Sequence, residues 1–174
     1  ENAGFANARN KAISLAGGDW IAIIDHDDIC FPNRLAKQAM DIQRNKDCSL
    51  FFGDSIHFTT NGTVVRKQFE KTKPYDFDLT KGNAKDMLIK HGCFIDSETV
   101  IFNKRAAGSI GGFNENYKYI TDYDFFLKMS GKYNFYCNQD ILSKWRIHDQ
   151  QATKIMKTVS YDEHIDLYKR YLNN

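Results

Sequence analysis

The chain has 174 residues, 42% of them hydrophobic and 14% aromatic, which excludes a disordered protein and allows one buried core. Its 24 lysines and arginines nearly balance 22 aspartates and glutamates, and aromatic residues do not alternate with basic ones, so no nucleic-acid partner is expected. No stretch resembles a secretory signal or the ~20 apolar residues of a membrane span. The four cysteines lack C-x-x-C spacing, which favours reduced thiols and a cytoplasmic protein. Without repeats or a linker, a single domain is expected over residues 1–174.

The first residues indicate a piece of a longer domain. The chain opens on Glu1-Asn2-Ala3-Gly4 without a methionine, and residues 5–16 already have helical spacing. The expected apolar face of this helix consists of Phe5, Ala8, Ala12, Ile13, Leu15 and Ala16. Gly17 and Gly18 end the helix, and a buried strand is expected over residues 20–24. A helix that leads into a strand apolar on both faces is typical of α/β proteins.

Strands and helices continue to follow one another along the chain. Pro32 fits the first turn of a second helix, whose predicted inward face is Leu35, Ala39 and Ile42. Asn61-Gly62 is a strong hairpin signal between two short segments, 56–58 and 64–67. The other expected elements are a strand at 49–52, a helix at 83–90, a strand at 99–102, a turn at Gly111-Gly112, a helix at 121–129, strands near Phe135 and at 142–146, and a C-terminal helix packed through Tyr161, Ile165, Tyr168 and Leu172.

Three carboxylates follow the first expected strand within four positions. Asp25, Asp27 and Asp28 come after an apolar segment, at the edge of an open α/β sheet where ligands bind. Carboxylates this close repel one another, and a hard cation such as Mg²⁺ or Mn²⁺ relieves the repulsion. Such a metal keeps positions open for the oxygens of a diphosphate. In the alternative interpretation these residues only begin the next helix, with Asp28 or Asn33 as its cap. The pattern alone leaves both interpretations open.

Several motifs around these carboxylates resemble family 2 glycosyltransferases of the GT-A fold. They are Asn2-x-Gly4-x-x-x-Ala8-Arg9-Asn10, Gly18-Asp19-Trp20-Ile21, Asp25-x-Asp27-Asp28 with Pro32 and Leu35, Ile110-Gly111-Gly112-Phe113, Thr121-Asp122-Tyr123-Asp124 and Trp145-Arg146-Ile147-His148. They stand in the family's order over most of the chain. The resemblance implies an α/β fold of GT-A type, a mixed sheet flanked by helices, that lacks the N-terminal segment which reads the nucleotide base.

The resemblance also assigns residues to the donor. Asp25 would face the ribose or the sugar of a nucleotide-sugar, and Asp27 would hold the metal, with Asp28 in support. Arg9 could reach a phosphate, and Arg146 would supply a charge-assisted bond to the diphosphate. A solvated surface position is the alternative for Arg9.

Further residues are assigned to the metal, the acceptor and the base. His148 would be a second metal ligand or a contact of the diphosphate, although a surface or core histidine is the commoner fate. Gly111 and Gly112 would let the acceptor or sugar approach closely, or would only form a turn. Asp122 is the candidate base. The assignment depends on Asp122 alone, because the family usually has Glu-Asp where this chain has Thr121-Asp122. Alternatively, Thr121 and Asp124 form a capping box.

The resemblance implies metal-dependent, inverting transfer of a sugar from a nucleotide-diphosphate sugar, most commonly a UDP-sugar, to a hydroxyl of a saccharide or lipid-linked acceptor. Such work serves surface polysaccharide or glycolipid assembly, at the inner face of a membrane. One alternative is a phosphohydrolase of the haloacid dehalogenase type, although Asp28 and Ile29 stand where that family has a different pattern after the second aspartate. Another is a non-catalytic domain that binds carbohydrate or metal.

Overall fold

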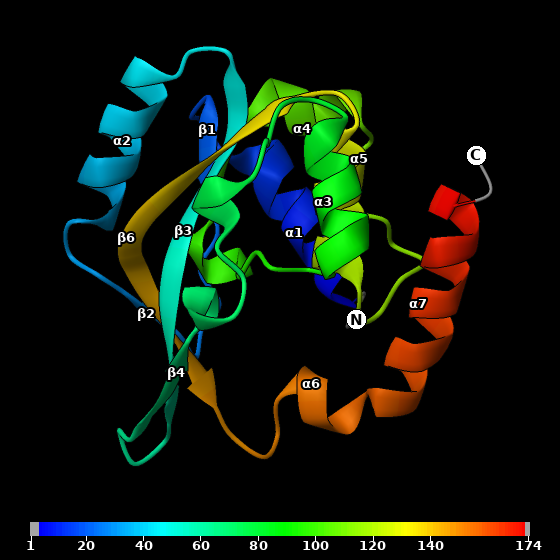
Figure 1. Cartoon of the computed structure of the whole chain (residues 1–174). Helices are drawn as coiled ribbons and strands as arrows, with labels where there is room; N and C mark the ends of the chain where they lie inside the picture. Colours follow the sequence, from blue (N-terminus) through cyan, green and yellow to red (C-terminus); the bar gives the residue numbers. More distant parts are fainter. Residues whose placement is uncertain (1–3, 173–174) are drawn as a thin grey trace.

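The computed structural model describes residues 4–172 and contains a curved mixed sheet with helices packed against it (Figure 1). The strands are β1 (Trp20–Ala22), β2 (Ile29–Cys30), β3 (Cys48–Thr59), β4 (Val64–Lys67), β5 (Ile101–Asn103) and β6 (Asn134–Ile147). Their order is β1-β5-β3-β6-β2, and β4 pairs with β3. The long strands β3 and β6 run parallel, whereas the other pairs are antiparallel. The α/β class with a mixed sheet is therefore confirmed.

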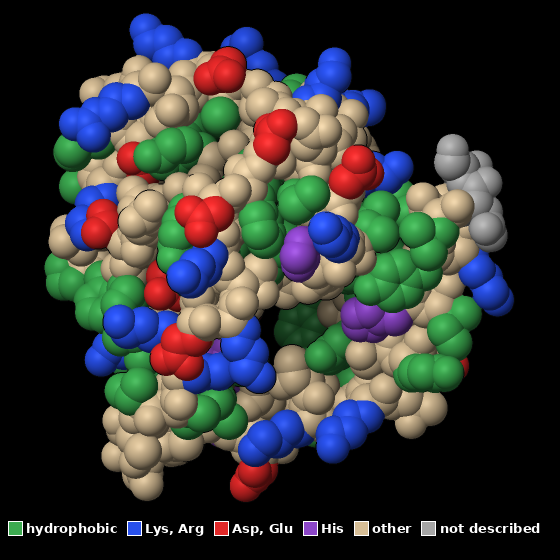
Figure 2. Space-filling view, viewed as in Figure 1, with side chains coloured by type: hydrophobic (Ala, Val, Ile, Leu, Met, Phe, Trp, Pro, Cys, Tyr) green, Lys and Arg blue, Asp and Glu red, His purple; other side chains and the backbone are tan. Residues whose placement is uncertain are grey.

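Helices cover the sheet unequally. They are α1 (Gly4–Leu15), α2 (Arg34–Arg44), α3 (Asn83–His91), α4 (Lys104–Ser109), α5 (Thr121–Ser130), α6 (Ala152–Ile155) and α7 (Lys157–Leu172). Figure 1 shows α2 on one side of the sheet, the group α1, α3, α4 and α5 on the other, and α7 as an outer layer beyond them. In the space-filling view, charges of both signs are interspersed and the surface is hollowed between the sheet and the α6–α7 arm (Figure 2).

The apolar core lies between β3 and α5. Leu50, Phe52 and Phe102 from the sheet are fully buried against Phe125 of α5. Phe125 stacks on Phe113 with ring centroids 4.2 Å apart. Burial of such side chains contributes roughly 1.5–3 kcal/mol each. All residues of α5 except two are buried, so its position relative to the sheet is fixed by packing.

Several predicted elements are confirmed and others are revised. β3 and β4 form the hairpin around Asn61-Gly62, and α3 and α5 match the predicted helices to within one residue. The strands predicted near Phe135 and at 142–146 are parts of the single strand β6. Residue 99 lies in a short turn, η3 (Ser97–Thr99), so β5 begins later than predicted. β1 is shorter than predicted and half-exposed, because within residues 4–172 it pairs on one side only.

The predicted inward face of α2 is wrong. Leu35 is 56% exposed, whereas Arg34 and Gln38 are buried. Arg34 donates to the backbone oxygens of Ile23 at 2.9 Å and Val100 at 2.8 Å, and also to the Gln38 side chain at 3.1 Å. Polar contacts with strand ends, rather than apolar packing, therefore determine which side of α2 faces the sheet.

The predicted faces of α1 and α7 also differ from the structure. In α1 the apolar residues Phe5 and Leu15 are 55% and 73% exposed, and Ala6 is the buried one. In α7, Tyr161 is 69% exposed and Leu167 is the buried residue. Each predicted face is confirmed in part, because Ile13 of α1 and Tyr168 of α7 are partly buried against the core. Polar residues occupy other positions on the inner sides, which hydrophobic periodicity does not predict. Asn2, part of the first motif, lies outside the described residues.

Replacement of Gly53 should destabilise the pairing of β3 with β6. An added Cβ would stand 2.6 Å from Leu142 Cδ1 and 2.8 Å from the backbone oxygen of Asp140. Because that oxygen belongs to the paired strand, we expect Gly53→Ala to lower the free energy of unfolding in urea by about 1–3 kcal/mol. Gly108→Ala, in α4, is the control, since a Cβ there meets nothing within 4 Å. Equal stability of the two variants would contradict this packing.

Glu98 should make stability depend on pH. It is 2% exposed, and its Oε1 has no hydrogen-bond partner among the described residues. Burial, with the nearby charges of Asp96 and Asp28, raises the pKa of Glu98 well above its ordinary value. The folded state thus holds the proton more tightly than the unfolded chain does. This contribution to stability is complete below about pH 4.3 and is lost as the pH rises through the folded-state pKa.

We expect Glu98→Gln to reduce the decrease of the free energy of unfolding with rising pH, measured by urea denaturation from about pH 5 to about pH 8. The exposed Glu70, changed to Gln, is the matched control and should keep the wild-type slope. A Glu98→Gln slope equal to that of the wild type would speak against a protonated buried carboxyl group.

Candidate active site

The strand-end carboxylates lie in the loop that connects β1 at one edge of the sheet to β2 at the other. The backbone turns there, with Asp28 N donating to Asp25 O at 3.2 Å. The side chains of Asp25 and Asp27 are 39% and 29% exposed, so both are open to a ligand. Because β2 pairs with β6 through Ile29 and Lys144, the loop lies beside the end of β6.

The end of β6 brings two predicted residues to this loop. His148 Nε2 is 2.9 Å from Asp27 Oδ2. The Arg146 side chain donates to Asp27 O at 2.8 Å, and its backbone N–H donates to Asp28 Oδ1 at 2.8 Å. The Arg146 guanidinium also lies 4.6 Å from the centre of the Phe58 ring. Arg146 therefore holds the carboxylate loop to the sheet.

These contacts affect the two neighbouring carboxyl groups in opposite directions. Partial burial alone would raise the pKa of Asp27, but the hydrogen bond from His148 and other nearby donors keep that pKa below its ordinary value. Burial raises the pKa of Asp28 to about 7, against the hydrogen bond from Arg146 N. Asp28 Oδ2 has no hydrogen-bond partner among residues 4–172. Asp27 is thus the charged member and Asp28 the supporting one.

Arg9 joins the strand-end loop to α5. One guanidinium nitrogen bonds Asp25 Oδ1 at 2.9 Å and the other bonds Asp122 Oδ1. Burial raises the pKa of Asp122, and the charge of Arg9 opposes that rise. Asp122 and Lys128 are the two residues of α5 that are not buried, and the Asp122 side chain is 30% exposed. The structure therefore brings together the candidate base and Asp25, the carboxylate predicted to face the donor.

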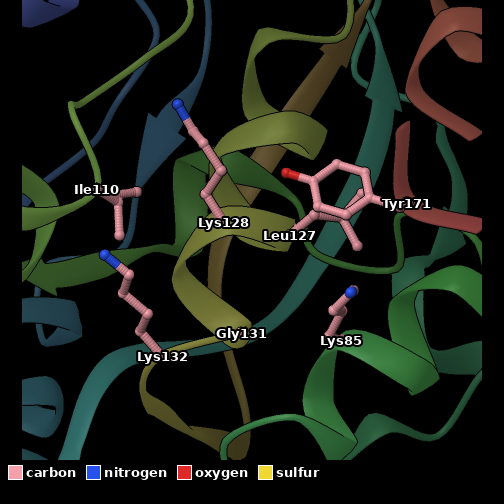
Figure 3. A pocket seen from close by; sticks show the side chains of 7 residues that line it. All are labelled: Lys85, Ile110, Leu127, Lys128, Gly131, Lys132 and Tyr171. Carbon is pink, nitrogen blue, oxygen red and sulfur yellow. The ribbon is translucent and has the colours of Figure 1, made fainter. Parts of the chain in front are cut away.

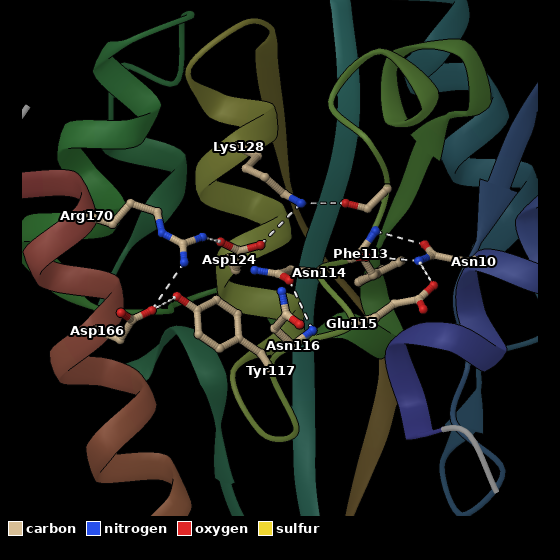
Figure 4. Close-up of polar contacts among 11 residues, drawn as sticks. Asn10, Phe113, Asn114, Glu115, Asn116, Tyr117, Asp124, Lys128, Asp166 and Arg170 are labelled. Carbon is tan, nitrogen blue, oxygen red and sulfur yellow. Dashed lines mark hydrogen bonds and ion pairs between the residues drawn. The ribbon is translucent and has the colours of Figure 1, made fainter.

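The Gly-Gly turn packs against α1. Gly111 and Gly112 have φ of 79° and 67°, values that favour glycine. A Cβ on Gly112 would stand 2.6 Å from Asn10 Oδ1. Asn10 accepts a hydrogen bond from Phe113 N at 2.8 Å and donates to Phe113 O at 2.9 Å (Figure 4). The close packing of Asn10 against the turn explains the two glycines. A contact between these glycines and an acceptor stays a prediction.

The predicted helix caps are absent. Ile120 is the N-cap residue of α5, and no side chain caps it, so Thr121 and Asp124 do not form a capping box. Asp124 is instead fully buried and pairs with Lys128 at 3.2 Å. Asn33 occupies the N-cap position of α2 without a side-chain hydrogen bond. The carboxylate pattern is therefore not accounted for by capping.

The residues present fit a divalent cation only in part. Among residues 4–172 no group of three or more His, Cys, Asp or Glu side chains is arranged to hold a metal. Asp27 and His148 provide two neighbouring ligand atoms. Mg²⁺ commonly takes few protein ligands and completes its coordination with water and substrate phosphates. The pair therefore suits a metal that arrives with a diphosphate.

Two hollows lie near these elements. One of about 460 Å³ adjoins Arg9 and Asp25 and is otherwise lined by apolar residues of α1, β1 and their neighbours. The other, of about 410 Å³, is lined by none of the predicted site residues (Figure 3). Its lining consists of Lys85, Ile110, Leu127, Lys128, Gly131, Lys132 and Tyr171. Only the first of these two hollows adjoins predicted site residues.

Three contributions to the site could not be found from the sequence pattern. Arg34 and Gln38 bond the strand ends near the carboxylates. They lie after Pro32 on the side of α2 that hydrophobic periodicity predicts to face solvent. Glu163 bonds backbone amides near α5, and backbone amides carry no sequence signal.

In residues 4–172 no helix combines the length and apolarity needed to cross a bilayer.

Comparisons with known proteins identify the family of the chain. A family model described as glycosyl transferase family 2 matches residues 1–98. An uncharacterized glycosyltransferase of Methanocaldococcus jannaschii is 29% identical over 163 residues, covering 92% of this chain and 53% of that protein. The chain thus spans about half the length of this relative.

Solved structures show the same fold. The crystal structure of TarS from S. aureus in complex with UDP matches with a TM-score of 0.61 at 18% identity, over 93% of this chain and 46% of that one. The TarS complex with UDP-GlcNAc matches with a TM-score of 0.63 at 18% identity, over 86% and 40%. The phosphohydrolase alternative would require a second acidic pair at strand ends. Asp122 and Asp124 lie in a helix instead. With a family model over more than half of its residues and a GT-A fold, the chain belongs to glycosyl transferase family 2.

Proposed function

We propose that this chain carries the donor and base sites of a metal-dependent, inverting glycosyltransferase, which moves a sugar from a UDP-sugar to an acceptor hydroxyl. The observation that carries the proposal is the Arg9 bridge, which joins the strand-end carboxylate Asp25 to Asp122 of α5. A direct displacement needs a base for the acceptor and a separate site for the leaving diphosphate. Asp122 and the Asp27–His148 pair fill these two roles.

Asp122 acts on the acceptor. Its carboxylate takes the proton of the acceptor hydroxyl as the acceptor oxygen bonds to the anomeric carbon and the bond from that carbon to the diphosphate oxygen breaks. Burial raises the pKa of Asp122 toward the working pH, while Arg9 favours the ionised form that can accept a proton. Arg9 also fixes the direction of the carboxylate.

The donor's diphosphate lies on the opposite side of the sugar, beside Asp27. Asp27 and His148 would hold Mn²⁺ or Mg²⁺, which when bound neutralises the charge that develops on the diphosphate. Asp25 faces the ribose or sugar, and Arg146 keeps the loop in place through Asp27 O and Asp28. The TarS structures with UDP and UDP-GlcNAc support a UDP-sugar as donor.

The acceptor is proposed from family membership alone. Saccharides and lipid-linked saccharides are acceptors of the kind that family 2 enzymes extend, which points to surface polysaccharide or glycolipid assembly. We place this work in the cytoplasm, at the inner face of a membrane where a lipid-linked acceptor would be met.

Asp27→Asn should abolish joint binding of metal and nucleotide. We expect UDP with Mn²⁺ to raise the melting temperature of the wild type by several degrees, because ligand at 100 times its Kd adds about 2.7 kcal/mol to stability. UDP alone and Mn²⁺ alone should have little effect, and Asp27→Asn should remove the joint shift. Asp86→Asn, an exposed carboxylate on α3, is the control and should keep it. A full shift in Asp27→Asn would refute the assigned metal ligand.

Asp122→Asn should separate catalysis from donor binding. The amide keeps the size of the side chain but cannot accept the proton, so we expect kcat for UDP release from UDP-GlcNAc to fall by about 10²–10⁴-fold. Binding of UDP with Mn²⁺, measured by calorimetry, should stay at the wild-type Kd. Turnover that survives in Asp122→Asn, with Asp86→Asn again as control, would exclude Asp122 as the base.

A further inference from the structure

One face of α7 contacts the segment that leads into α5. Glu163, Asp166 and Arg170 are spaced by three and four residues, so they lie on the same side of the helix. The Glu163 carboxylate accepts three backbone N–H groups, from Lys118 at 2.7 Å, from Tyr119 at 2.9 Å and from Ile120 at 3.0 Å. These are the last three residues before the helix that carries the candidate base.

Glu163 binds the amides just ahead of α5, whose N-cap residue makes no side-chain hydrogen bond. Ile120 offers no side-chain acceptor, and its own N–H lies at the helix N-terminus, where the macrodipole favours a negative charge. A carboxylate that receives several such amides makes charge-assisted hydrogen bonds, which are roughly twice as strong as neutral ones. A residue of α7 therefore fixes the start of α5, two positions before Asp122.

The other two residues of this face extend the contact. Tyr117 donates its hydroxyl to Asp166 at 2.6 Å, and Arg170 bonds the same carboxylate at 3.2 Å (Figure 4). Arg170 also lies 3.7 Å from the buried Asp124 and over the Tyr117 ring at 5.3 Å. Arg170 thus joins α7 to both ends of the segment 117–124.

From Asp124 the same network reaches the Gly-Gly turn. Lys128 pairs with Asp124 at 3.2 Å and donates to Gly112 O at 2.6 Å. Asn10 holds the next residue, Phe113, from the α1 side. The segment with Asp122 is therefore held by α7 from one side and by α1 from the other (Figure 4).

We propose that Glu163 is a positioning residue for Asp122, through which α7 clamps the start of α5 in the geometry needed for proton transfer. The proposal rests on the proposed function of Asp122 as the base. A misplacement of a catalytic group by about 1 Å can cost a hundredfold in rate, so the clamp acts on turnover rather than on donor binding.

The first test compares Glu163→Gln with Asp162→Asn, which removes the same charge one residue away on the exposed side of α7. Amide hydrogen exchange is measured at residues 118–120. We expect exchange there to become about tenfold faster in Glu163→Gln and to stay unchanged in Asp162→Asn. Wild-type exchange in Glu163→Gln overturns the clamp. This result does not depend on any enzymatic activity.

The second test measures turnover of UDP-GlcNAc with Mn²⁺. We expect kcat of Glu163→Gln to fall about ten- to a hundredfold with KM for the donor unchanged, and Asp162→Asn to match the wild type. A raised KM with unchanged kcat overturns the positioning role. A wild type without turnover would count against the proposed function, and the exchange result would still decide whether the clamp exists.

Tyr117→Phe tests the same clamp should Glu163→Gln not fold. It keeps the ring under Arg170 and removes only the hydroxyl that donates to Asp166. We expect a smaller loss of kcat, with KM unchanged and faster exchange in the segment 117–124. A kcat and exchange equal to those of the wild type overturn the proposal.

Discussion

The Arg9 guanidinium is the contact on which the site depends, because no strand pairing joins the two carboxylates that it binds. Asp25 follows β1, and Asp122 opens α5 far along the chain. Two carboxylates facing one another would repel, and the shared cation makes the arrangement stable. The next residue, Asn10, clasps Phe113 after the Gly-Gly turn. The inner side of α1 thus combines these polar contacts with the apolar packing of Ala6 and Ile13.

Two other guanidinium groups, the buried Arg34 and the exposed Arg170, also join separate segments of the fold. Arg34 bonds the backbone oxygens of Ile23 and Val100, and Arg170 reaches Asp124 and Asp166. A guanidinium suits this role because it offers five donors in one plane and stays charged when buried. Apolar packing fixes β3 against α5, whereas directional bonds fix the segments that carry the reactive groups. Apolar packing tolerates small shifts, and the directional bonds set the positions of individual oxygens.

Local signals were enough for some elements and failed for others. The Asn61-Gly62 hairpin, α3 and α5 follow from turn chemistry and helix spacing, which act over a few residues. The inward face of α2 did not follow, and those of α1 and α7 followed only in part, because periodicity assumes that apolar residues point to the core. These helices also contact the sheet or the segment before α5 through polar side chains, namely Arg34, Asn10 and Glu163.

The residues of the candidate site were predicted from their types and their order along the chain, and not from their contacts in the folded structure. Asp25, Asp27 and Asp122 could be nominated because carboxylates after a strand and at a helix start have a chemical meaning, and the structure brings Arg9 and His148 to them. The partner of Asp122 could not be named, since the choice of Arg9 depends on how α1 lies against α5. Glu163 was missed because its partners are backbone amides, which every residue possesses.

The parallel pairing of β3 with β6 determines when the site can exist. These strands pair from Cys48 with Asn134 to Thr59 with Ile147, so a long loop must close before the pairing yields contacts. Arg146 and His148 reach Asp27 only at the end of β6. A chain still emerging from the ribosome therefore has its carboxylate loop without the partners that orient it. The orientation of the carboxylate loop therefore depends on completion of the pairing between β3 and β6.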